Sequence, residues 1–98
     1  MIATMTPDNF QKRGMYKYVC FAGGIVHFCN ALNHNISHKH MVDEHPHLKP
    51  LSAGTISVNI KEWKIIDGGS MTAKLPYLPT DEDAIDKALK PYGFYLKE

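Results

Sequence analysis

The histidines of this 98-residue chain are the residues whose number and spacing first indicate chemistry. All six lie between His27 and His47. His34 and His38 are four residues apart and His27 lies seven before His34, so one face of a helix would carry all three. Two imidazoles at that spacing can share a zinc ion, with a third ligand from His40, His45 or His47. One hypothesis is therefore a histidine-rich metal-binding protein, and its alternative is a histidine-rich surface that binds no metal.

The segment Gly68-Gly69-Ser70 is a second candidate for ligand binding. Successive glycines can turn several backbone N–H groups toward one anion, and the serine hydroxyl adds a donor. The alternative is a glycine pair that forms a bulge beside a surface serine. The segment matches neither the phosphate-binding loop nor the dinucleotide fingerprint.

Two cysteines, Cys20 and Cys29, are too few for a disulfide framework, and both lie in apolar segments. We expect buried, reduced thiols and a cytoplasmic protein. As a nucleophile, either thiol would need a histidine within hydrogen-bond reach, and no local motif supplies one. The sequence shows neither a signal peptide nor an apolar run of the ~18–20 residues that cross a membrane.

The charge balance excludes some classes of partner. Lysine and arginine total 11 against 10 for aspartate and glutamate, and Arg13 is the single arginine. Binding to a phosphate backbone needs a basic stripe, so we expect no nucleic-acid partner, and we expect no membrane partner and no cofactor.

Periodicity divides the chain into a flexible N-terminal arm, residues 1–14, and a single α+β domain, residues 15–98. The expected strands cover 16–21, 55–60, 63–66 and 94–96, and the expected helices run from 25 to the 43–46 stretch and over 80–90. The first helix is predicted from the spacing of Ile25, Leu32 and Ile36, and the second from the acidic first turn after Thr80. This order predicts a βαββαβ ferredoxin-like plan, an antiparallel sheet with two helices packed on one face.

Three stretches together resemble the Janus/Ocnus family of phosphohistidine phosphatases. Residues 15–19, Met-Tyr-Lys-Tyr-Val, are similar to the first strand of that family. Val26-His27 stands where the family has Tyr-His with its catalytic histidine. Residues 53–57 and 64–71 are similar to a Gly-Gly-Arg-Ile strand and a later Gly-x-Ser-Met segment.

The resemblance implies that the chain hydrolyses a phosphoramidate, with a phosphoprotein as substrate. His27 would be the general base or nucleophile, Lys17 would stabilise the phosphate charge, and Ser70 with Gly69 and Met71 would hold the phosphoryl oxygens. The family has an arginine where this chain has Thr55. It also has one more strand between its counterparts of Lys17 and His27.

A third hypothesis is a non-catalytic protein that binds or inhibits a larger partner. Tyrosines are frequent anchors of protein interfaces, and Tyr77, Tyr92 and Tyr95 lie outside the expected core. A net charge near zero is compatible with protein contact.

Overall fold

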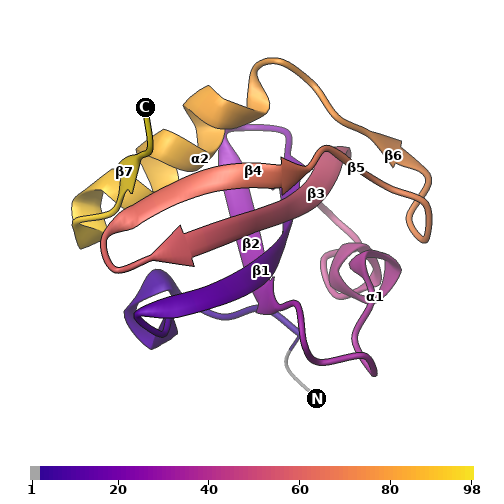
Figure 1. Ribbon diagram of the computed structural model, residues 1–98. Coiled ribbons are helices and arrows are strands. Elements are labelled where there is room, and N and C mark those ends of the chain that lie inside the picture. Colours follow the sequence, from indigo (N-terminus) through magenta and orange to yellow (C-terminus); the bar gives the residue numbers. More distant parts are fainter. Residues whose placement is uncertain (1–2) are drawn as a thin grey trace.

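The computed structural model describes residues 3–98, and its largest element is a curled five-stranded sheet (Figure 1). The strand order is β2-β1-β3-β4-β7, with antiparallel neighbours throughout except for the parallel pair β4 and β7. Strands β5 and β6 form a separate two-stranded ribbon. The elements are η1 Pro7–Asn9, β1 Arg13–Phe21, β2 Ile25–Asn30, α1 His38–Asp43, β3 Pro50–Asn59, β4 Glu62–Asp67, β5 Gly69–Ser70, β6 Leu75–Pro76, α2 Asp81–Leu89, η2 Lys90–Tyr92 and β7 Tyr95–Leu96.

Each face of the sheet carries its own hydrophobic core, because side chains alternate along β1. Tyr16 and Tyr18 point to the face where Ile85 of α2 packs, and Val19 points to the face where Met41 of α1 packs. The two short helices therefore lie on opposite faces, as Figure 1 shows. Neither helix in residues 3–98 is long and apolar enough to cross a membrane.

The ferredoxin-like prediction is wrong, since the chain is mostly sheet, with 40% strand and 22% helix. The expected helix from Ile25 is instead strand β2, a turn and the short helix α1. Gly23 and Gly24 have φ values of +88° and +78°, which suit a tight hairpin, so the chain reverses and β2 pairs with β1. The helix expected over 80–90 is present as α2.

The N-terminal segment contacts the sheet from residue 3 onward, and the first two residues of the expected arm lie outside the described residues. The backbone N–H of Met5 donates to the carbonyl of Phe28 on β2 at 2.7 Å. The Phe10 ring stacks on Tyr16 with 3.9 Å between ring centroids. These contacts bring the arm against the edge strand of the sheet.

A buried carboxylate connects α2 to the central strands. Asp81, only 2% exposed, accepts hydrogen bonds from the Tyr18 hydroxyl at 2.8 Å, the Ser52 hydroxyl and the Leu78 backbone N–H at 3.3 Å. Burial, and secondarily the bond to Asp81, raises the pKa of Tyr18 far above its usual range, so its hydroxyl remains a donor. Three donors compensate the carboxylate for its lost hydration.

This network makes a stability prediction. Asp81→Ala should lower the free energy of unfolding by about 2–4 kcal/mol, because it leaves the buried hydroxyls of Tyr18 and Ser52 without their acceptor. Urea unfolding followed by circular dichroism measures the change. Asp83→Ala, on the exposed side of the same helix turn, is the matched control and should cost no more than about 0.5 kcal/mol. Equal losses for the two variants would refute a structural role for the network.

Candidate functional site

The candidate site is a hollow of about 670 Å³ between the sheet, α1 and the β5–β6 ribbon. It contains four of the five site residues expected from the sequence, Lys17, Gly69, Ser70 and Met71. The histidine that lines it is His38, and His27 lines another hollow. The full lining is Lys17, His38, Asp67, Gly68, Gly69, Ser70, Met71, Thr72 and Leu75.

His38 is the first residue of α1, and the local sequence fixes the point where that helix begins. Ser37 is the N-cap: its hydroxyl accepts from the backbone N–H of His40. In return, Nδ1 of His40 accepts from the backbone N–H of Ser37 at 3.1 Å. This reciprocal capping box stabilises a helix of only six residues.

One contact determines which nitrogen of His38 is available for chemistry. Nε2 lies 2.7 Å from the carbonyl oxygen of Gly54 on β3. A carbonyl can only accept, so Nε2 carries the proton and donates it. In the neutral ring the lone pair is then on Nδ1, the nitrogen left for a ligand.

The surroundings of His38 favour that neutral ring. Burial lowers its pKa below the usual value, and the nearby Lys17 ammonium lowers it further. The hydrogen bond to Gly54 and the carboxylate of Asp67 act in the opposite direction without cancelling the effect of burial. At neutral pH the side chain is therefore an uncharged nitrogen base beside a positive charge.

Lys17 both orders the approach to α1 and supplies positive charge. Its Nζ donates to the carbonyl of Asn33 at 3.0 Å and to that of Ile36. An ammonium has three N–H groups, so one remains for a ligand. The two carbonyls belong to the turn that leads into α1, so the lysine also fixes where His38 lies.

Ser70 and Gly69 form the wall of the hollow on the ribbon. Ser70 is buried, and its oxygen accepts from the backbone N–H of Ala73 at 3.2 Å, which leaves its O–H as a donor. Gly69 has φ +153°, a conformation that side chains rarely adopt. Met71, in contrast, is 95% exposed at the rim.

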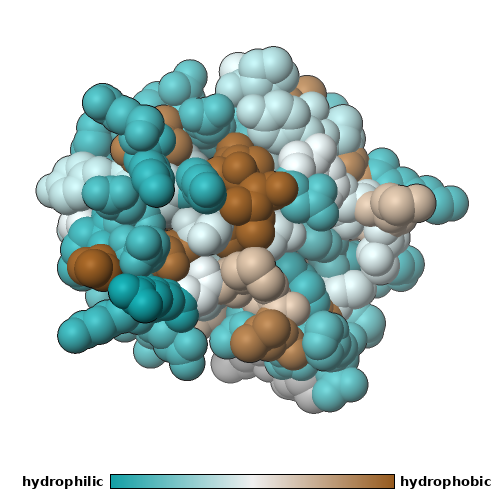
Figure 2. Space-filling view, viewed as in Figure 1, coloured by the Kyte–Doolittle hydropathy of each residue, from teal (hydrophilic) through white to brown (hydrophobic). Residues whose placement is uncertain are grey.

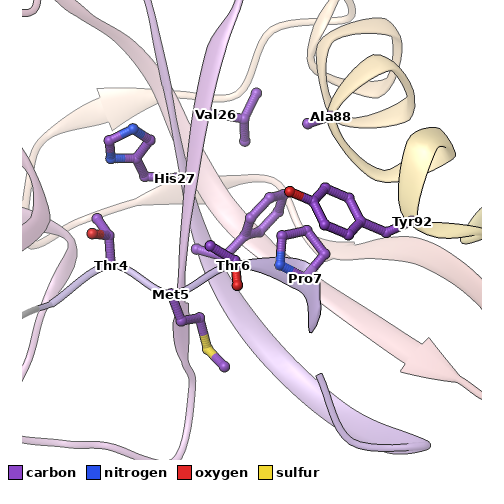
Figure 3. A pocket seen from close by; sticks show the side chains of 9 residues that line it. Thr4, Met5, Thr6, Pro7, Val26, His27, Ala88 and Tyr92 are labelled. Carbon is purple, nitrogen blue, oxygen red and sulfur yellow. The ribbon is translucent and has the colours of Figure 1, made fainter. Parts of the chain in front are cut away.

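His27 lies on the edge strand β2 and pairs with a second histidine. Its Nδ1 is 2.6 Å from Nε2 of His45, and the two rings meet edge to face with 4.1 Å between centroids. It lines a hollow of about 310 Å³, and Figure 3 shows it on the opposite side of β2 from Val26 and Tyr92. Burial, and then His45, lowers the pKa of His27, while Glu44 opposes the shift.

The helical histidine face expected from the sequence is wrong. His27 is on a strand, His34 is in a turn and His38 begins α1, so no helix carries all three. Within residues 3–98, no three or more His, Cys, Asp or Glu side chains are grouped so that they could hold a metal ion. Both cysteines are free and buried, and burial raises the pKa of Cys20 to about 12, which disfavours its thiolate.

The histidine pair predicts a loss of stability in acid. The pKa of His27 is lower in the folded chain than its ordinary value of 6.5, so below pH 6.5 the unfolded chain binds more protons. Stability should therefore be complete above that pH and fall as the pH drops toward the folded pKa. Urea unfolding from pH 7.5 to 5 should show a shallower decline for His27→Gln than for the natural chain. His34→Gln, at an exposed turn, is the control, and an unchanged slope in His27→Gln would contradict the prediction.

Comparisons of the chain with protein-family models, with curated proteins and with solved structures give no match. The site combines a neutral histidine, an ammonium with one free N–H and a serine hydroxyl around one hollow.

Proposed function

We propose that this chain hydrolyses phosphoramidates, as phosphohistidine phosphatases do, with His38 in the role that the sequence suggested for His27. The observation that carries the proposal is the shared hollow. His38 lines it together with Lys17 and Ser70, whereas His27 is paired with His45 elsewhere.

The change of histidine also improves the resemblance to that family. In the family a strand separates the counterparts of the lysine and the catalytic histidine. Strand β2 lies between Lys17 and His38 in this chain, whereas no complete strand separates Lys17 from His27. The order of lysine strand, further strand, histidine helix, glycine strand and serine segment then agrees with the family plan.

The arrangement suits phosphoryl transfer, which mainly needs positioned charge and one group that handles a proton or forms a bond. Nδ1 of His38 would attack phosphorus, or would take a proton from an attacking water. The free N–H of Lys17 and the hydroxyl of Ser70 would hold the phosphoryl oxygens. The P–N bond breaks, and the departing nitrogen keeps the electron pair. From a phosphohistidine that is protonated on its second ring nitrogen, the leaving group is a neutral imidazole. With direct attack, water then releases phosphate from His38.

Phosphoproteins are the substrates that we propose, and the cytoplasm is the compartment. The hollow is open to the surface at Met71, which a peptide chain could contact. Two buried free thiols suit a reducing compartment.

The protein-binding alternative stays a prediction. Tyr77, Tyr92 and Tyr95 are 37%, 40% and 54% exposed, but Tyr77 and Tyr92 line different hollows. On the face seen in Figure 2, apolar surface forms small separate areas among hydrophilic side chains. A large apolar patch would be the usual mark of a docking face.

The decisive test compares two histidines. A phosphohistidine peptide should lose its phosphate in the presence of the natural chain, and His38→Gln should lower kcat/KM about a hundred- to ten-thousandfold. His27→Gln should retain most of the activity, because its ring lies outside the hollow. Circular dichroism of both variants checks that they fold. Activity that survives in His38→Gln and is lost in His27→Gln would refute the assignment.

The pH dependence of this activity follows from the protonation of His38. The reaction needs the neutral ring, and the pKa of His38 in the free protein is below 6.5. We therefore expect the acidic limb of kcat/KM to be centred below pH 6.5. A pH profile of kcat/KM from 4.5 to 8 measures this, and an acidic limb centred above 6.5 would contradict it.

A further inference from the structure

The hollow contains the carboxylate of Asp67, a negative charge that hydrolysis of an ordinary phosphate ester would not use. Lys17 pairs with Thr55, and Thr55 pairs with Asp67, so the three residues form one row across β1, β3 and β4 on one face. Neighbouring strands are about 4.8 Å apart, which places the Cα atoms of Lys17 and Asp67 about 10 Å from each other. The hollow is therefore positive at one end and negative at the other.

Asp67 is close enough to His38 to act on it. Its carboxylate stabilises the protonated form of the ring, in opposition to Lys17. Asp67 is exposed at the end of β4, and no ion pair within residues 3–98 neutralises it. It is thus a carboxylate in the same hollow as His38 whose charge no ion pair of the described residues compensates.

A bipolar hollow is unfavourable for a phosphate monoester. Its phosphoryl group is negative and its leaving oxygen becomes more negative as the P–O bond breaks, so a nearby carboxylate repels it. A phosphohistidine is different, because its ring carries an N–H and a positive charge when the nitrogen that is not bonded to phosphorus is protonated, and the ring then leaves as neutral imidazole. A carboxylate beside the ring accepts a hydrogen bond from that N–H and stabilises the charge.

We infer that Asp67 is the specificity-determining residue of this site and selects phosphoramidates with a basic leaving nitrogen against phosphate esters. The inference rests on the proposed function. In the step, the His38 nitrogen or water bonds to phosphorus, the P–N bond breaks, and its electron pair stays on the departing nitrogen. The leaving imidazole is neutral, and its second ring nitrogen keeps its proton and donates it in a hydrogen bond to Asp67.

The experiment measures discrimination rather than activity alone. The ratio of kcat/KM for a phosphohistidine peptide to that for p-nitrophenyl phosphate is determined for the natural chain and for Asp67→Asn. Asparagine keeps the size of the side chain and removes its charge. We expect the ratio to fall about ten- to a hundredfold, through a lower value for the phosphoramidate and an equal or higher value for the ester. Asp83→Asn, on α2 at the opposite face, is the matched control and should leave the ratio unchanged.

A second readout needs no substrate. Nitrogen-15 NMR of the His38 ring should show a lower pKa in Asp67→Asn than in the natural chain, since the carboxylate raises it. Hydrolysis by the natural chain with an unchanged ratio in Asp67→Asn would overturn the inference and leave the proposed function intact. A natural chain that hydrolyses neither compound would overturn both.

Discussion

The candidate site depends on the close approach of three elements at Gly54. A Cβ atom at this position would collide with the Asp67 carbonyl and lie 2.7 Å from the Tyr18 hydroxyl. Because glycine lacks that atom, Tyr18 reaches Gly54 from the α2 face and the bulged end of β4 comes alongside it. The Gly54 carbonyl then holds Nε2 of His38 on the α1 face. The absence of a side chain at position 54 thus allows Tyr18 on one face and His38 on the other to contact the same residue.

This constraint connects the buried carboxylate to the site. Asp81 holds the Tyr18 hydroxyl on the α2 face, and that hydroxyl packs against Gly54, whose carbonyl fixes the tautomer of His38. The neighbouring residue on β1, Lys17, points to the other face and orders the turn before α1. Two successive residues of one strand therefore hold the histidine from two directions. Groups fixed in this way need little reorganisation when a ligand binds.

The sequence predicted the elements whose local signals agree with their tertiary environment. The alternation along β1 and β3 and the acidic first turn of α2 all lead to the observed elements. The segment from Ile25 gave two competing signals: three- and four-residue apolar spacing favoured a helix, and the run of β-branched and aromatic residues favoured a strand. The segment forms a strand because it pairs with β1. Gly23-Gly24 was the local signal that could have indicated the hairpin between the two strands.

The wrong prediction of a helix from Ile25 also explains which site residues could be found from the sequence. Lys17, Gly69, Ser70 and Met71 were recognised from their own segments, and the structure brings them to one hollow. The histidine was assigned to position 27 because Val26-His27 resembles the Tyr-His of the phosphatase family and a helix was expected to begin there. The capping residue Ser37, which marks the true start of the helix, was the signal for His38. Asp67 had no local signal, since its role depends on a pairing across three strands.

That pairing also gives a physical reason for the threonine at position 55. The phosphatase family that the sequence resembles has an arginine there, between the positions of Lys17 and Asp67. Thr55 and Asp67 are directly opposite on neighbouring strands, where Cβ atoms lie about 5 Å apart. A guanidinium at position 55 would reach the Asp67 carboxylate, pair with it and neutralise it. Threonine cannot do so, and the carboxylate then keeps its charge toward the hollow. The absence of a cation at position 55 and the uncompensated charge of Asp67 therefore have one electrostatic cause, the threonine between Lys17 and Asp67.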